Sequence, residues 1–236
     1  MKSSVKILSL AAVLATGTLS SAAQTNSPAG VPVATAGARQ TASFQKHIKP
    51  ILDALNLQDA AKETNVSNVL SAFLTAHAAW HQANDAALKG YWNDFNHARS
   101  AQDKAGADKA LAGIGGVYAT FKPEHDKLIS GLATVLSPEQ IATVEDVLTV
   151  NKVKVTYNAY LEIFPTLTDE QKEVVLKDLE SARDEAVDAG SMAEKSAFFK
   201  KYKIIIEEDY LARQGYDPKQ ARKDFAAKQK AAAAAQ

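Results

Sequence analysis

Thr168-Asp169-Glu170-Gln171 has the residue pattern with which helices begin. A hydroxyl side chain at the N-cap accepts a hydrogen bond from the backbone N–H three residues on, and Gln at that third position bonds back to the N-cap. Ser137-Pro138-Glu139-Gln140 repeats this capping box with Pro at the first helical position. Ser191 to Glu194 and Asp217 to Gln220 follow the same plan. The sequence therefore predicts four helix starts, each cap contributing about 1 kcal/mol.

Helix stops and apolar spacing agree with these starts. Pro165, Gly190 and Gly215 each lie just ahead of a predicted start, where they end the preceding helix. Apolar side chains recur at the three- and four-residue intervals of a helix face. They do so in residues 66–88, 153–164, 175–186 and 198–206.

Two stretches are less regular. Val153 to Tyr157 alternates like a strand, but its continuation through Phe164 has helical spacing, so we predict a helix there. Glycines at 113, 115 and 116 predict a weak or kinked helix, and Pro123 restarts the next one. Residues 44–228 are therefore expected to form an all-α antiparallel bundle of about seven or eight helices with no sheet.

The two ends of the chain lack this periodicity. Residues 1–23 have a basic start, an apolar core and the small-residue site Ser21-Ala22-Ala23, the form of a secretory signal peptide. The apolar core is about half the roughly 20 residues that span a membrane, so we expect no span after cleavage. Residues 24–43 predict a disordered linker, and residues 229–236 an alanine-rich tail. The mature protein is expected in the periplasm or outside the cell.

Composition excludes several classes of function. The 236 residues carry 27 Lys and Arg against 27 Asp and Glu, so no basic footprint for nucleic acid is present. The chain contains no Cys, which excludes disulfide scaffolds, thiolate metal sites and cysteine nucleophiles. We expect neither nucleic acid nor a cofactor as a partner.

His77 and His81 are the histidines with metal-ligand spacing. They lie four residues apart on one helical face, with Asp85 a further turn along, and together can present three ligands to a divalent ion. The zinc-protease motif requires Glu after the first His, but position 78 is Ala. The favoured interpretation is therefore structural histidine without metal. Whether His125 approaches these residues in space is not a property of the sequence.

No catalytic residues are predicted. Neighbouring carboxylates such as Asp184-Glu185 and Glu207-Glu208-Asp209 share a polar helix face, whereas an acid and a base need opposed positions and different environments. Gly113-Ile114-Gly115-Gly116 lacks the preceding strand and the Lys of a phosphate loop. The aromatic side chains are numerous enough for a platform on which a sugar ring stacks, although such residues at helical spacing also fit a core.

An ordered series of motifs resembles a family of uncharacterised secreted bacterial helical proteins to which sugar binding has been ascribed. The motifs are Trp80-His81, Pro123–Asp126, Leu136–Gln140, Val155–Tyr160, Leu167–Lys172, Ala182–Ala186, Asp188–Ser191, Glu194-Lys195, Lys201–Lys203, Tyr210-Leu211 and Gly215–Asp217. The resemblance covers most of residues 50–225 and implies no established catalytic residue. Ile204–Glu208 departs from the family pattern, which is more polar there.

Three functions follow from these observations. The favoured one is a non-enzymatic, exported binding or accessory protein with a carbohydrate ligand in a cleft between helices. Its candidate ligand-binding residues are Trp80, His81, His125 and Tyr157. One alternative is a periplasmic chaperone, because Leu167–Gln171 is similar to the LTxxQ phrase of such proteins, and it predicts an exposed apolar or basic cradle. The other alternative is a metal-assisted hydrolase built on His77, His81 and Asp85.

Overall fold

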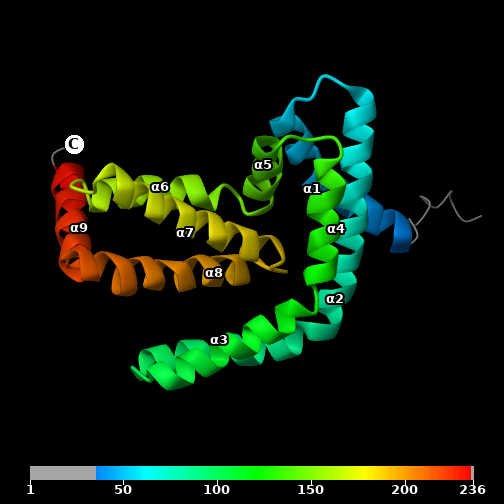
Figure 1. Ribbon diagram of the computed structural model, residues 1–236. Coiled ribbons are helices and arrows are strands. Elements are labelled where there is room, and N and C mark those ends of the chain that lie inside the picture. Colours follow the sequence, from blue (N-terminus) through cyan, green and yellow to red (C-terminus); the bar gives the residue numbers. More distant parts are fainter. Residues whose placement is uncertain (1–35, 235–236) are drawn as a thin grey trace, which may run out of the picture.

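A computed structural model describes residues 36–234, and within that range every regular element is helical (Figure 1). The predicted all-α fold without a sheet is confirmed for this part of the chain. Its nine α-helices slightly exceed the expected number, and a short π-helix and a 3₁₀ turn join α8 to α9. The bounds are α1 Ala36–Leu55, α2 Ala60–Ser100, α3 Lys104–Ala119, α4 Lys122–Ala133, α5 Pro138–Leu148, α6 Lys152–Ile163, α7 Asp169–Val187, α8 Met192–Ile204, η1 Ile205–Leu211, η2 Ala212–Gln214 and α9 Pro218–Ala234.

The four predicted helix starts are confirmed by their hydrogen bonds. Ser137 and Thr168 form complete capping boxes with Gln140 and Gln171 at the starts of α5 and α7. Ser191 caps α8 by accepting from the backbone N–H of Glu194. At the start of α9, the Asp217 carboxylate accepts from the backbone N–H of Gln220. Local side-chain chemistry thus sets where these helices begin.

Helix α2 connects the two halves of the molecule. Figure 1 shows α2 bending along its length, with α1, α4 and α5 gathered around its first half and α3 running back along its second half. The first half belongs to a core built on residues such as Ile51, Leu70, Phe121 and Leu132. The second half joins a different core, shared with α3 and α6 to α8. Trp80 contacts both cores, so it lies where they meet.

Helices α6 to α9 form an arm beside the α2–α3 hairpin (Figure 1). The arm is tied to α2 at its surface, where Arg99 pairs with Glu208 at 2.7 Å. Inside the arm, Glu207 of η1 accepts from the Tyr160 hydroxyl at 2.7 Å and pairs with Arg222 of α9. The segment Ile204–Glu208 is where α8 ends and the helix widens into η1.

Several boundaries differ from the sequence expectation. Helix α1 begins at Ala36, inside the expected 24–43 linker, because the residues from Ala36 to Gln40 include good helix formers. Helix α9 continues to Ala234 through the alanine-rich tail, whose described side chains are exposed. The Val153–Tyr157 stretch is helical, as predicted, and α3 continues through Gly113 to Gly116 without a break.

The expected signal peptide at residues 1–23 lies outside the described residues. None of the helices between residues 36 and 234 is both long enough and apolar enough to cross a membrane.

Candidate functional site

Asp188 joins three histidines from two other helices. It is the C-cap of α7, so its backbone carbonyl has no partner within the helix. That carbonyl oxygen lies 3.0 Å from His77 Nε2 and 2.8 Å from His81 Nε2, and both histidines belong to α2. Its carboxylate lies 2.9 Å from Nδ1 of His125 on α4. One residue at the end of a helix therefore holds α2, α4 and α7 together.

Gly190 allows this approach. A Cβ atom at position 190 would lie 2.5 Å from His81 Nδ1 and 2.7 Å from His81 Cε1, closer than real Cβ atoms approach other atoms. The φ angle of Gly190 is not in the left-handed region, so residues with a side chain can adopt the same backbone conformation. The glycine predicted as a helix stop is therefore required by its contact with the His81 ring.

Burial sets the protonation of the groups around Asp188. Desolvation raises the pKa of the Asp188 carboxyl above its usual range, and the hydrogen bond from His125 opposes that rise. The same hydrogen bond raises the pKa of His125. Burial, followed by the charge of His81, lowers the pKa of His77 to about 4. His77 is therefore neutral near pH 7 and donates its single ring N–H to the Asp188 carbonyl.

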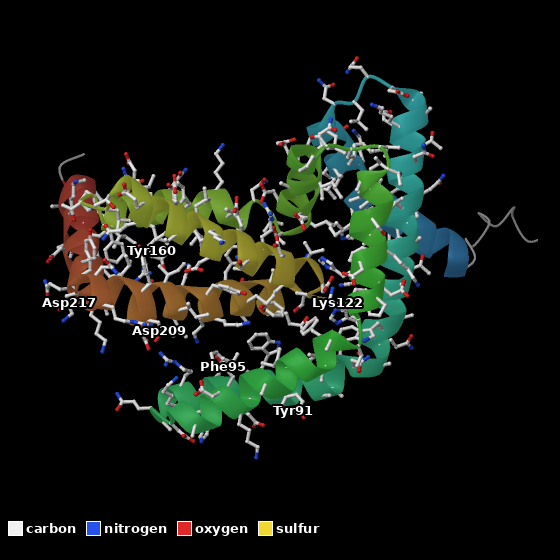
Figure 2. The ribbon with its side chains drawn as sticks, in the orientation of Figure 1. Tyr91, Phe95, Lys122, Tyr160, Asp209 and Asp217 are labelled. Atoms are coloured by element: carbon white, nitrogen blue, oxygen red, sulfur yellow. The ribbon has the colours of Figure 1, made fainter. Side chains whose placement is uncertain are left out.

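A cleft of about 360 Å³ opens beside this junction, and we call it the Asp188 cleft. Its wall combines apolar side chains from α3 and α8 with polar ones from α4, α7 and α8. Figure 2 shows Lys122 where the start of α4 meets the end of α7. The lining residues are Leu111, Ile114, Gly115, Tyr118, Ala119, Lys122, His125, Asp184, Glu185, Asp188, Phe198 and Lys201.

The cations that line the Asp188 cleft are paired with carboxylates. Lys122 Nζ lies 2.6 Å from the Asp126 carboxylate, and Lys201 Nζ lies 2.7 Å from that of Glu185. Behind the wall, Arg183 contacts Asp184 at 3.2 Å. The cleft thus presents oxygen and nitrogen atoms in compensated pairs, without a lone cation among its described lining residues.

Aromatic side chains support one side of the cleft. Tyr118 lines it, and the ring of Trp80 packs behind Tyr118 with their centroids 5.3 Å apart. The Trp80 indole N–H donates to the Thr120 hydroxyl at 2.9 Å, which fixes the indole. Burial, followed by the charge of Glu194, raises the pKa of Tyr118, so its hydroxyl stays protonated. That hydroxyl oxygen is itself buried, so Tyr118 contributes its ring to the cleft wall.

A sequence family covers this whole site, because its match runs over residues 41–231. The chain belongs to the DUF3826 family. The family is described as proteins of unknown function, so the assignment names a lineage and leaves the activity open. No curated protein matches the chain.

The fold of this DUF3826 protein brings together three of the four residues predicted to bind ligand. His125 lines the Asp188 cleft, while His81 and Trp80 lie directly behind its wall, with their rings 4.9 Å apart. Tyr157 lies on α6 and does not line this cleft. Asp188 and Tyr118 were not among the candidates, although Asp188 belongs to a motif that carried the family resemblance.

A second cleft in the DUF3826 fold, also of about 360 Å³, is lined by residues that adjoin His81. Asp85, Trp92 and Glu194 line it, and it shares no lining residue with the Asp188 cleft. Here His81 Nδ1 lies 2.6 Å from Asp85 Oδ1, and ligand atoms of His81, Asp85 and Glu194 all lie within 4.8 Å of one another. His77, which the sequence pairs with His81, is turned toward the Asp188 carbonyl and is not part of this group.

Proposed function

We propose that this chain is an exported carbohydrate-binding or accessory protein whose ligand occupies the Asp188 cleft. The main support is that the Asp188 cleft combines an apolar wall with charged groups that are already paired with groups of opposite charge. The apolar faces of a sugar ring pack on such a wall, while its hydroxyls bond to carboxylates, ammonium groups and histidine. The cleft volume lies at the lower end of the range for small-molecule sites, which suits a short saccharide.

Charge favours a neutral ligand over an anionic one. A phosphate or carboxylate ligand needs a cation that is not already neutralised, yet Lys122 and Lys201 both have close carboxylate partners. A neutral hydroxyl both donates and accepts, so it can join an existing ion pair without unbalancing its charge. The buried Asp188 carboxylate, held by His125, provides an acceptor in the wall of the cleft.

The His125–Asp188 pair also supports a second candidate function, acid–base chemistry on the bound ligand. Asp188 fixes the His125 ring through Nδ1, and His125 is one of the residues that line the cleft. A histidine oriented in this way by a carboxylate is a recurring arrangement for a general base. This candidate requires product release from the ligand, which binding alone does not.

The chaperone alternative gains no support from the surface. Large hydrophobic side chains that are exposed in the described part of the chain are Tyr91, Val150, Val155 and Met192. They come from four separate segments: α2, the turn between α5 and α6, α6 and α8. An exposed patch on a single concave face is what holding an unfolded client requires.

Thermal-shift screening against neutral plant and bacterial saccharides tests the proposal. Saccharides that bind the native protein should raise its melting temperature. His125→Gln should weaken the apparent affinity for the saccharide at least about tenfold and so reduce this rise. His47→Gln is the matched control, because His47 lies exposed on α1. Release of shorter products from the same saccharides would establish the acid–base candidate. An unchanged melting curve with every saccharide, together with protection of a denatured client from aggregation, would replace the proposal with the chaperone.

A further inference from the structure

We infer that His81, Asp85 and Glu194 form a binding site for a divalent transition-metal ion, at the wall of the second cleft and separate from the Asp188 cleft. The three side chains come from two helices: His81 and Asp85 lie one turn apart on α2, and Glu194 lies in the first turn of α8. One imidazole and two carboxylates are a donor set that suits zinc and similar ions.

The hydrogen bonds of His81 indicate where a cation belongs. Its Nε2 lies 2.8 Å from the Asp188 carbonyl oxygen, which only accepts, so Nε2 carries the proton. In the neutral ring, Nδ1 then presents a lone pair, and that lone pair lies 2.6 Å from the carboxylate oxygen of Asp85. Two lone pairs at this distance need a positive charge between or beside them, which is supplied either by a second ring proton or by a metal ion.

The second ring nitrogen is placed as in metal-binding histidines. Histidines that ligate metals almost always donate their other ring N–H to a carboxylate or backbone carbonyl, which fixes the tautomer and the ring orientation. His81 makes that contact with the Asp188 carbonyl, and it is 6% exposed, so its ring is held in place on all sides. Gly190 adds to this, because its lack of a Cβ is what allows the ring to lie there.

The two carboxylates have no ion-pair partner other than the His81 ring among the described residues. Neither Asp85 nor Glu194 forms an ion pair with a Lys or Arg within residues 36–234, although their oxygens converge. Glu194 is oriented by the backbone N–H of Gly190, which donates to Oε2 at 3.0 Å. A dication would offset the repulsion between these like charges.

Coordination requires only modest side-chain movement. Ligands at about 2.0–2.1 Å from a tetrahedral zinc ion lie about 3.3 Å from each other, so Asp85 would move about 0.7 Å away from the His81 ring. Ligand atoms at the 4.8 Å limit of the group would move about 1.5 Å closer together. The Asp85 side chain is 66% exposed and free to do so. Three protein ligands leave a coordination position facing the second cleft, whose wall also contains the buried indole of Trp92. The Trp92 N–H has no hydrogen-bond partner among the described residues and offers a donor to whatever enters.

Calorimetric titration of the chelator-treated full chain with zinc chloride tests this site, with manganese chloride as a second probe. One ion per chain should bind, and a hundredfold excess over the dissociation constant should raise the melting temperature by about 5–10 °C. Asp85→Asn and Glu194→Gln keep the size of each side chain and should each weaken binding at least about tenfold. Asp94→Asn, an exposed carboxylate further along α2, is the matched control and should bind like the wild type.

Nuclear magnetic resonance signals of the His81 ring nitrogens show whether Nδ1 binds a metal ion or carries a proton. In the zinc-loaded protein, Nδ1 should carry no proton while Nε2 keeps its own. A doubly protonated His81 ring in the presence of excess zinc, or binding unaffected by both carboxylate variants, would overturn the site. Saccharide binding measured in chelator reports on the Asp188 cleft alone, because the two clefts share no lining residue.

Discussion

Replacing Gly190 with alanine should destabilise the protein by closing the space that the His81 ring occupies. The new Cβ would lie 2.5 to 2.8 Å from three ring atoms of His81. The ring cannot retreat freely, because it is buried and bonded at both nitrogens. Overpacking of this kind costs about 1–3 kcal/mol. For a domain of this size the melting temperature should fall by roughly 2–12 °C.

Gly116→Ala provides the matched control with the opposite sign. No atom lies within 4 Å of a Cβ at position 116, in the last turn of α3. Alanine there should stabilise the helix by about 1 kcal/mol, because glycine is the poorer helix former. Both variants are compared with the wild type by denaturant unfolding and calorimetry, in chelator so that bound ions do not contribute.

A double-mutant cycle identifies the cause. In a His81→Ala background the ring is gone, so Gly190→Ala should then cost less than about 0.5 kcal/mol. The steric explanation is refuted if Gly190→Ala is as stable as the wild type, or if its cost is unchanged without the His81 ring.

Two further effects follow from the charged groups. Because the folded pKa of His125 is raised by Asp188, the stability from this pair is full below the unfolded value of 6.5 and is lost as pH rises through the folded pKa. The stability difference between the wild type and His125→Gln should therefore be larger at about pH 6 than at about pH 9 in urea unfolding, and an equal difference would refute the pairing. Arg183→Met should cost about 3–5 kcal/mol, because it leaves the buried Glu145 carboxylate, 3.2 Å from Arg183, without its partner. Lys49→Met, in an exposed pair on α1, should cost less than about 1 kcal/mol by the same measurement, and equal costs would contradict the role of burial.

The parts of the fold that sequence predicts are those set by neighbouring residues. The capping boxes at Ser137 and Thr168 join residues three positions apart, so the local sequence pattern predicts their hydrogen bonds directly. Helix α1 is described from Ala36, whereas the sequence prediction places the start of the helical domain at residue 44. Residues with helix propensity continue on both sides of that position, so propensity alone does not place the boundary.

The site depends on contacts that sequence spacing does not contain. His81 and Asp188 are 107 positions apart, and their hydrogen bond exists only because the end of α7 meets the middle of α2. The spacing of His81 and Asp85 indicated their shared face, but Glu194 joins them from α8 and has no sequence relation to them. Gly190 is a second example, because a glycine that ends a helix and a glycine required by close packing give the same sequence pattern. Tyr157 was placed on a helix face correctly, but spacing does not tell which cleft that face adjoins.

Saccharide titration of a matched pair of leucine variants tests the proposed ligand site most directly. Gly115 lines the Asp188 cleft, whereas its neighbour Gly116 does not, and a Cβ at either position meets no atom within 4 Å. Both Gly115→Leu and Gly116→Leu should stabilise α3 by somewhat less than about 1 kcal/mol. Only Gly115→Leu should fill the cleft and abolish the saccharide-induced rise in melting temperature, while Gly116→Leu should keep it. Equal saccharide binding by the two variants would contradict a ligand in the Asp188 cleft.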